Sequence, residues 1–330
     1  MRRLLISQRM GDRTTLDRLK LVTYSHDVQA HGVISERFPE VASSVAVAAD
    51  EMLNAAIDAD IIFMARAYKR EMVLCARSLK WLHLAGAGVD RLRPFDDLPP
   101  EITITHTPSL NAHMMADYVM CVISMLTWKF PRILRNQQQQ CWQRWSIEKL
   151  EGKTLVLVGM GNVGTAIASR ARAAQMSLVG VRRRPQSQDG FARVVAPHRL
   201  MDVLPQADYL VICAPLTAET ESLIGSHEMQ VMKPSAYLVN VGRGAIIDEE
   251  ALGVALEKGQ IAGAALDVFV EEPLPTESKL WQLPNVITTP HISAYSPDYD
   301  ARALALFCSN LERFLAGKTL RHVVDRSREY

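Results

Sequence analysis

Residues 154–181 read TLVLVGMGNVGTAIASRARAAQMSLVGV and contain the pattern Gly-x-Gly-x-x-Gly at Gly159, Gly161 and Gly164. The glycines directly follow an apolar run typical of a strand and directly precede a segment of helical period. In such a turn the first glycine permits a tight bend, the second lets the backbone approach a pyrophosphate, and the third lets the helix pack closely on the strand. An ordinary glycine-rich turn is the alternative. The strand, turn, helix and second strand in succession favour a dinucleotide-binding domain.

Short apolar runs rich in Val and Ile alternate with helical segments along the chain, a rhythm typical of βαβ units and parallel sheets. The first series of expected strands comprises residues 19–24, 44–49, 60–65, 80–85 and 102–107. The second comprises residues 154–159, 176–181, 208–214, 236–241, 263–268 and 285–290. Because a full dinucleotide-binding sheet has about six strands, the sequence predicts an α/β fold with two Rossmann-like, doubly wound parallel-sheet domains.

Two helical segments outside the strand series indicate where the domains divide. An apolar segment that starts after Asn111 and ends near Pro131 predicts a long connecting helix, followed by an expected loop at the four glutamines 137–140. The last helical segment, 301–318, needs an apolar partner, and packing back on the first domain would make that domain discontinuous. We therefore expect residues 1–108 plus 295–330 to form one domain and residues 109–294 to form the dinucleotide-binding domain. Residues 1–17 have no clear place in the pattern.

Composition excludes several classes of partner. The 37 basic and 36 acidic side chains nearly balance, so the overall charge gives no argument for binding nucleic acid or an anionic membrane. No apolar stretch approaches the ~18 residues of a membrane span, which predicts a soluble protein. The five cysteines are odd in number and never form a C-x-x-C pair, so neither a disulfide framework nor a metal site is expected. A cytoplasmic location fits best.

The strand at 176–181 is followed by Arg182, Arg183 and Arg184, where a carboxylate usually binds the adenosine ribose. An Asp or Glu would accept hydrogen bonds from the ribose 2′-OH, whereas a guanidinium can hold a 2′-phosphate with two charge-assisted hydrogen bonds. A solvated basic turn is the alternative. With Arg182 and Arg183 as candidate phosphate ligands, we predict that NADP(H) is preferred and that NAD(H) is possible.

Segments of the chain resemble the D-isomer-specific 2-hydroxyacid dehydrogenase family. They are the glycine turn, LAGAGVDRL (84–92), NVGRGAIID (240–248), ALDVFVEEPLP (265–275) and PNVITTPHIS (284–293). The resemblance covers nearly the whole chain from about residue 20 and implies a flavodoxin-like fold for the substrate domain. In that family an Arg, a Glu and a His act together, which implies Arg243, Glu272 and His291 as the catalytic residues.

The same three residue types suit the chemistry without the resemblance. Reduction of a 2-keto acid requires a proton for the developing alkoxide and a cation for the carboxylate. His291 can donate that proton because the pKa of histidine lies nearest physiological pH. Arg243 can pair with the carboxylate and polarise the carbonyl oxygen, and Glu272 can orient the imidazole and favour its charged form.

Each of these residues also has a plain structural explanation. The Gly-Arg-Gly turn at Arg243 can be a solvated loop, Glu272 stands beside Glu271 and can be a surface carboxylate, and His291 follows Pro290 at a strand end. All three nevertheless follow successive expected strands, and the carboxyl edge of such a sheet is where ligands bind. Together they predict an active site.

The resemblance implies further binding residues. The backbone N–H groups at Ala87 and Gly88 would donate to the substrate carboxylate, and Asp267 would accept from the nicotinamide carboxamide or else only cap a strand end. The remaining implied cofactor-binding positions are Asn162, Val163, Pro215, Thr220, Val241 and Gly242.

The ending PLPTESKLWQLPNVITTPH and the tail VDRSREY resemble bacterial glyoxylate/hydroxypyruvate reductases within the family. Trp142 and Trp145 occupy a region where some members send a tryptophan into the neighbouring subunit's substrate site, which implies a homodimer with Trp142 as a candidate substrate contact. Packing of both rings under the loop is the equal alternative. Asp117 departs from the family by standing where Glu is common, a change expected to affect only helix contacts.

These observations predict NADPH-dependent reduction of a small 2-keto acid, of the glyoxylate or hydroxypyruvate type, to the D-2-hydroxy acid. An NAD-linked dehydrogenase of another 2-hydroxy acid, such as phosphoglycerate, is one alternative. Formate dehydrogenases carry Gln at the position of Glu272, which counts against them. A dinucleotide-sensing scaffold without catalysis is the alternative from another class, because fold does not settle function.

Overall fold

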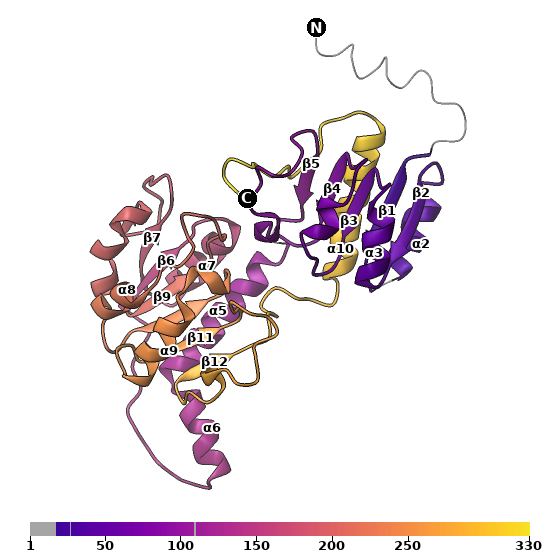
Figure 1. Cartoon of the computed structure of the whole chain (residues 1–330). Coiled ribbons are helices and arrows are strands. Elements are labelled where there is room, and N and C mark those ends of the chain that lie inside the picture. Colours follow the sequence, from indigo (N-terminus) through magenta and orange to yellow (C-terminus); the bar gives the residue numbers. More distant parts are fainter. Residues whose placement is uncertain (1–17, 27, 109) are drawn as a thin grey trace. The chain divides into compact units, whose positions relative to one another are not determined.

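The structure is a computed structural model that describes residues 18–26, 28–108 and 110–330. These residues form two compact units. Unit 1 contains the described residues of 1–108 together with Pro297–Tyr330, and unit 2 contains those of 109–296 (Figure 1). Residues 1–17, which had no clear place in the strand pattern, lie outside the described residues.

Unit 1 is built on a five-stranded parallel sheet with the strand order β2-β1-β3-β4-β5. Its strands are β1 (Lys20–Tyr24), β2 (Ala42–Ala46), β3 (Ile61–Met64), β4 (Trp81–Leu84) and β5 (Thr103–His106). Its helices are α2 (Val28–Arg37), α3 (Ala49–Ala56), α4 (Glu71–Leu74), the 3₁₀ turn η1 (Asp90–Leu92) and α10 (Tyr299–Leu315). The order 2-1-3-4-5 is that of flavodoxin, so the expected fold of this unit is confirmed.

The second strand of unit 1 ends earlier than the sequence indicates. It was expected at 44–49, but β2 ends at Ala46 and α3 begins at Ala49. The Glu51 carboxylate accepts hydrogen bonds from the backbone N–H groups of Val47 and Ala48, at 2.8 and 3.0 Å. This contact satisfies the free N–H groups at the start of the helix and thereby ends the strand.

Helix α10 supplies part of the core of unit 1, so the chain returns to this unit at its end. The ring of Phe307 is fully buried and stacks on Phe63 of β3 and Trp81 of β4, with centroid distances of 4.4 and 5.1 Å. His83 lies beside the same ring and shares a 2.7 Å hydrogen bond with the Thr105 hydroxyl. Burial lowers the pKa of His83 to about 3, so this histidine is a neutral member of the core.

Unit 2 is built on a seven-stranded parallel sheet with the order β12-β11-β10-β9-β6-β7-β8. Its strands are β6 (Thr154–Val158), β7 (Ser177–Val181), β8 (Arg193–Val195), β9 (Tyr209–Ile212), β10 (Tyr237–Asn240), β11 (Gly263–Leu266) and β12 (Val286–Thr288). Its α-helices are α5 (Ala112–Thr127), α6 (Phe130–Gln138), α7 (Asn162–Ala173), α8 (Ser226–Val231) and α9 (Glu249–Glu257). Short 3₁₀ turns are η2 (Pro197–Asp202), η3 (Leu204–Gln206), η4 (Gly244–Ile246) and η5 (Lys279–Trp281).

All six strands expected in this unit are present, but the expected number was wrong because β8 adds a seventh. This strand has three residues and pairs only with β7, at the edge of the sheet. A three-residue edge strand that starts with Arg193 carries almost no alternation of apolar and polar residues, which is why the sequence does not reveal it.

The connecting helix also differs from expectation. It was expected to end near Pro131, but α5 ends at Thr127 and Pro131 lies in the first turn of α6, after Lys129 with φ 58°. Proline is well tolerated there because the first N–H groups of a helix have no partner within it. The expected loop at 137–140 is therefore wrong for its first half, since α6 continues to Gln138.

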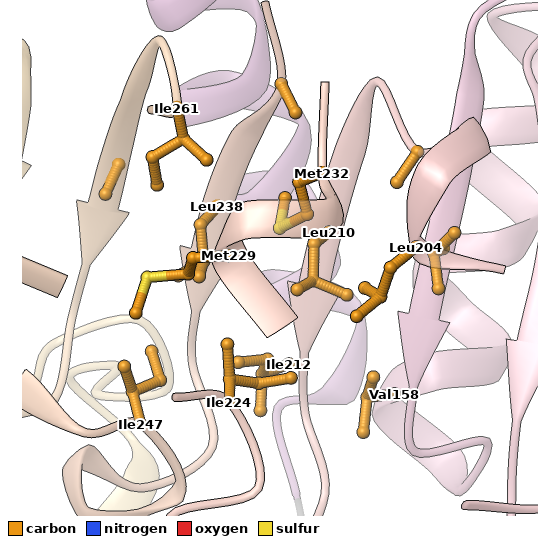
Figure 2. Close-up of a cluster of buried hydrophobic side chains, with 14 of the residues drawn as sticks. Val158, Leu204, Leu210, Ile212, Ile224, Met229, Met232, Leu238, Ile247 and Ile261 are labelled. Carbon is orange, nitrogen blue, oxygen red and sulfur yellow. The ribbon is translucent and has the colours of Figure 1, made fainter. Parts of the chain in front are cut away.

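Helices cover both faces of the unit 2 sheet, so its strands are buried on both sides. On one face, Leu210, Ile212 and Leu238 pack with Ile224 and Met229 from the α8 region (Figure 2). On the other face, buried side chains of α5 and α7 pack against the strands. Strands covered in this way read as continuous apolar runs, so the polar side chains of this unit gather where strands end.

None of the described helices is both long and apolar enough to cross a membrane. Within the described ranges, no group of three or more His, Cys, Asp or Glu side chains is placed to hold a metal ion.

Replacement of Phe307 by Ala tests how strongly α10 holds unit 1. The change removes a fully buried ring, so we expect the free energy of unfolding to fall by about 3–5 kcal/mol. Denaturant unfolding measures it. Leu74→Ala, at a side chain that is 46% exposed, is the control and should cost less than about 1 kcal/mol. Equal effects of both changes would contradict a core role for Phe307.

Candidate active site

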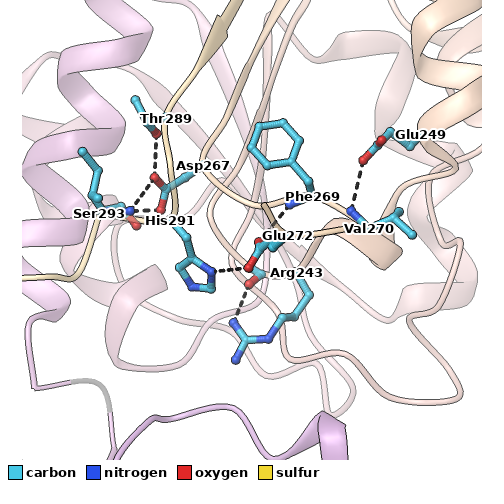
Figure 3. Close-up of polar contacts among 11 residues, drawn as sticks. Arg243, Glu249, Asp267, Phe269, Val270, Glu272, Thr289, His291 and Ser293 are labelled. Atoms are coloured by element: carbon cyan, nitrogen blue, oxygen red, sulfur yellow. Dashed lines mark hydrogen bonds and ion pairs between the residues drawn. The ribbon is translucent and has the colours of Figure 1, made fainter. Parts of the chain in front are cut away.

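The side chains of His291 and Glu272 form a pair at the carboxyl edge of the unit 2 sheet (Figure 3). His291 follows β12 and Glu272 follows β11, the neighbouring strand. His291 Nδ1 lies 2.9 Å from Glu272 Oε2, and Glu272 Oε1 accepts a 3.1 Å hydrogen bond from the Phe269 N–H. A carboxylate at Nδ1 fixes the proton on that nitrogen and leaves Nε2 to exchange a proton with a substrate.

Several groups compete to set the pKa of Glu272. Its burial alone would raise the pKa, but the hydrogen bond to His291 and the one from Phe269 N–H outweigh this effect, with a smaller contribution from the charge of Arg243. The net result is a pKa below the ordinary value. Glu272 is therefore ionised at neutral pH, the state in which it can orient the imidazole.

His291 occupies a left-handed turn, with φ 53°. This conformation is strained for a residue with a side chain, so the surroundings must hold it. The backbone N–H of His291 donates to the carbonyl of Asp267 at 2.9 Å, and the fully buried Asp267 carboxylate accepts from the N–H groups of Ile292 and Ser293, both at 3.0 Å. These three hydrogen bonds fix the turn that carries the imidazole.

A hydroxyl chain reaches the same carboxylate from α5. Thr289 donates to Asp267 at 2.6 Å, and the Tyr118 hydroxyl lies 2.7 Å from the Thr289 hydroxyl. Burial raises the pKa of Tyr118 to about 12, so its phenol keeps its proton and donates it along the chain. Tyr118 and Thr289 are site residues that the sequence did not indicate, because a Tyr in an apolar helix and a Thr in a strand are ordinary core residues.

The loop that carries Arg243 is held by Asn240, the last residue of β10. Asn240 is 1% exposed, accepts from the Gly242 N–H at 3.0 Å, and donates to the Arg243 carbonyl at 2.9 Å. A Cβ on Gly244 would lie 1.9 Å from the Phe269 carbonyl carbon, so only glycine fits there. Asn240 was not among the expected site residues, although an amide at the end of an apolar strand is the signal that could have indicated it.

The glycine turn has the geometry that a dinucleotide requires. Gly159 has φ 101°, and a Cβ there would lie 2.7 Å from the Ala214 N, while a Cβ on Gly164 would lie 2.2 Å from the Gly159 carbonyl oxygen. A Cβ on Gly161 would meet no atom within 4 Å, so the second glycine borders open space at the start of α7. No side chain caps this helix, which leaves the N–H groups of its first turn for an anion. These residues fit a bound pyrophosphate.

The other expected cofactor residues lie around this turn. Asn162 and Val163 form the start of α7, and the buried Val241 and Gly242 follow β10. Thr220 was expected to flank the cofactor, and its hydroxyl donates to the Pro215 carbonyl at 2.7 Å. That bond shapes the loop after β9.

Arg182 and Arg183 follow β7 as the sequence indicates. Arg182 is half-buried, and its backbone N–H donates to the Val195 carbonyl at 3.0 Å. Arg183 Nε donates to Glu219 Oε2 at 3.0 Å, a contact that the sequence did not reveal.

Ala87 and Gly88 follow β4 in unit 1, where Ala87 is exposed. Their proposed contact with a carboxylate stays a prediction. Trp142 is 94% exposed, so its ring packs against almost nothing within the described residues of unit 2. Trp145 instead lies under Arg132, whose guanidinium carbon is 4.5 Å from the ring centroid. Trp145 therefore packs within unit 2, and the contact of Trp142 with a partner's substrate stays a prediction.

The sequence profile described as D-isomer specific 2-hydroxyacid dehydrogenase, NAD binding domain, matches residues 120–293. The chain belongs to the D-isomer specific 2-hydroxyacid dehydrogenase family. The matched span includes the glycine turn, Arg243, Glu272 and most of the His291 turn. The expected family and an oxidoreductase with a dinucleotide-binding domain are thus confirmed.

Known members of the family are similar over most of the chain. Glyoxylate/hydroxypyruvate reductase B of Pectobacterium carotovorum is 37% identical over 232 residues, which cover 68% of this chain and 72% of the relative. D-3-phosphoglycerate dehydrogenase of Methanocaldococcus jannaschii is 30% identical over 299 residues, 88% of this chain and 56% of the relative. The solved structure of a D-isomer specific 2-hydroxyacid dehydrogenase from Xanthobacter autotrophicus, in complex with NADPH and MES, matches with a TM-score of 0.81 and 28% identity, covering 95% of this chain and 100% of that chain.

The lowered pKa of Glu272 predicts how the stability of this dehydrogenase depends on pH. Because the folded-state pKa lies below the ordinary value of 4.5, ionised Glu272 stabilises the fold at pH values above 4.5, and this stabilisation is lost as the pH falls through the folded-state pKa. We expect the wild type to lose more stability than Glu272→Gln between about pH 5 and pH 3, as measured by urea unfolding. If the two proteins lost stability equally as the pH falls, the lowered pKa of Glu272 would be contradicted.

Proposed function

We propose that this dehydrogenase reduces a small 2-keto acid, of the glyoxylate or hydroxypyruvate type, to the D-2-hydroxy acid with NADPH. The observation that carries the proposal is the Glu272–His291 pair, which follows β11 and β12 at the sheet edge that also bears the glycine turn. The Pectobacterium relative, named a glyoxylate/hydroxypyruvate reductase, supports this substrate class.

The residues of the chain divide the chemistry among them. When bound, NADPH supplies the hydride for the carbonyl carbon. His291 donates a proton from Nε2 to the developing alkoxide, while the Glu272 carboxylate holds Nδ1–H and stabilises the charged imidazole. Arg243 pairs with the substrate carboxylate and polarises the carbonyl oxygen with its guanidinium. The charge of Arg243 also contributes to keeping Glu272 ionised.

Cofactor choice rests on the end of β7. Arg182 stands where a carboxylate would accept from the ribose 2′-OH, and Arg183 follows it, so we assign the 2′-phosphate of NADP(H) to these guanidiniums. The Xanthobacter structure, which contains NADPH, supports this choice. NAD(H) remains a second, weaker cofactor.

We assign the remaining binding roles as the family resemblance implies. Ala87 and Gly88 donate backbone N–H groups to the substrate carboxylate, and Asp267 accepts from the nicotinamide carboxamide. The other proposed cofactor contacts are Asn162, Val163, Pro215, Thr220, Val241 and Gly242. A cytoplasmic location accords with the five cysteines, all of which are free thiols.

The phosphoglycerate dehydrogenase of Methanocaldococcus makes an NAD-linked dehydrogenase the second candidate function.

Replacement of His291 by Gln tests the first candidate function, the reduction of a 2-keto acid with NADPH. We expect the wild type to oxidise NADPH with glyoxylate or hydroxypyruvate, and His291→Gln to lower kcat by about 10²–10⁴-fold because the proton donor is gone. NADPH absorbance measures turnover, and protein fluorescence measures NADPH binding, which should change little.

Turnover of phosphoglycerate with NAD⁺, and none of the 2-keto acids with NADPH, would instead establish the second candidate. No turnover with any of these pairs would contradict both.

We further propose that the protein is a homodimer, with the exposed apolar surface around α6 at its interface. Four side chains form this surface, and none of the α6 residues is buried. They are Trp128 (53% exposed), Phe130 (37%), Leu134 (49%) and Trp142 (94%). Exposed large apolar side chains that gather in one segment of a chain are typical of interaction surfaces. In such a dimer, Trp142 is the candidate contact to the partner's substrate.

Replacement of Leu134 by Lys tests the dimer. A buried charge at the interface should shift the mass measured by light scattering from two chains to one. Leu53→Lys changes a leucine that is 38% exposed on α3 of unit 1 and should leave the mass at two chains. A wild type of one chain's mass would contradict the proposal.

A further inference from the structure

An ion pair joins two loops at the carboxyl edge of the unit 2 sheet. Arg183 follows β7, and Glu219 lies in the loop after β9, with Arg183 Nε 3.0 Å from Glu219 Oε2. In the sheet, β6 lies between β7 and β9. The pair therefore connects the loops on either side of the strand that ends in the glycine turn. Ligands of such sheets bind in this region.

The loop that carries Glu219 is well held. The Thr217 N–H donates to the Thr220 hydroxyl at 2.8 Å, the same hydroxyl donates to the Pro215 carbonyl at 2.7 Å, and Thr217 is 3% exposed. The backbone N–H groups of Thr220 and Glu221 both donate to the Thr217 carbonyl at 3.0 Å. Glu219 lies within this tight turn, so the position of its backbone beside Arg183 is fixed.

An NAD site has a carboxylate beside the adenosine ribose, and this chain has one nearby that comes from a different loop. In the usual arrangement a carboxylate at the end of the second strand accepts from the ribose 2′-OH and repels a 2′-phosphate. Here Arg182 occupies that place, and the carboxylate that pairs with Arg183 comes from the loop after β9.

We propose that Glu219 is a specificity-determining residue for the cofactor. Its carboxylate favours the 2′-OH of NADH and opposes the 2′-phosphate of NADPH, so it limits the preference that Arg182 and Arg183 create. This inference rests on the proposed function, because it assigns the 2′-phosphate to the end of β7.

The size of the effect follows from exposure. The Glu219 side chain is 62% exposed and that of Arg183 is 38% exposed, so solvent screens their charges. Exposed charge pairs of this kind change an equilibrium by a factor of at most about five, and salt at 1 M, where the screening length is about 3 Å, weakens them further.

Fragments of the cofactors test the inference without any catalysis. Isothermal titration calorimetry would measure the binding of 2′,5′-ADP, which carries the 2′-phosphate, and of 5′-AMP, which carries the 2′-OH. For Glu219→Gln we expect 2′,5′-ADP to bind about two- to fivefold more tightly at low salt, and 5′-AMP to bind equally or more weakly. The gain for 2′,5′-ADP should shrink at 1 M salt.

Two further variants serve as controls. Asp189→Asn removes a carboxylate from the same loop as Arg183, one that lies 3.8 Å from Arg172, and should leave the ratio of the two affinities unchanged. Arg182→Ala should weaken the binding of 2′,5′-ADP and leave the binding of 5′-AMP unchanged.

The outcomes separate this inference from the proposed function. If wild type prefers 2′,5′-ADP and Glu219→Gln leaves the ratio unchanged, or weakens both fragments equally, the role of Glu219 is wrong and the cofactor assignment stands. An equal change of the affinity ratio in Asp189→Asn would also overturn the role of Glu219, because the effect would then come from the net charge of the protein. If wild type does not prefer 2′,5′-ADP, the cofactor assignment itself fails, and the inference fails with it.

Discussion

The covering of both faces of the unit 2 sheet is the constraint on which the site depends. Strands buried on both faces carry mostly apolar side chains along their length, so in unit 2 the charged groups gather at the strand ends. Asn240 and Asp267 are both almost fully buried. Asn240 forms hydrogen bonds with the backbone of the loop that follows β10, and Asp267 accepts hydrogen bonds from the backbone of the loop that follows β12. The sheet thus sets the place of the site, and these two side chains set the shape of its loops.

The carboxylate of Asp267 holds the turn of His291 and is also the proposed contact for the nicotinamide. Its carboxylate accepts from Thr289, Ile292 and Ser293, and a carboxylate offers about four lone-pair positions. The proposed hydrogen bond from a nicotinamide carboxamide would use the position that remains. The residue expected to bind the cofactor therefore also holds the left-handed turn of His291. A change at Asp267 cannot separate the two roles, whereas Tyr118 acts on the carboxylate only through the Thr289 hydroxyl.

The sequence predicted the fold class, all eleven strands that have clear apolar runs, and the family, because these depend on repeated local patterns and on the order of motifs. It missed β8, which is too short for a pattern, and it extended β2 past the cap that Glu51 makes for α3. In the site, the pairing of His291 with Glu272 could be expected from chemistry. The Arg183–Glu219 pair could not, since it joins residues 36 positions apart whose meeting depends on the strand order.

The strand order also separates the choice of cofactor from the reaction. The proposed catalytic residues follow β10, β11 and β12, whereas Arg182, Arg183 and Glu219 follow β7 and β9. From β7 to β11 the sheet crosses four strand spacings of about 4.8 Å, or about 19 Å in all. Charges that far apart at an exposed edge are separated by more than the screening length of about 8 Å at physiological salt. We therefore expect substitutions around Arg183 to leave the electrostatics of the Glu272–His291 pair unchanged.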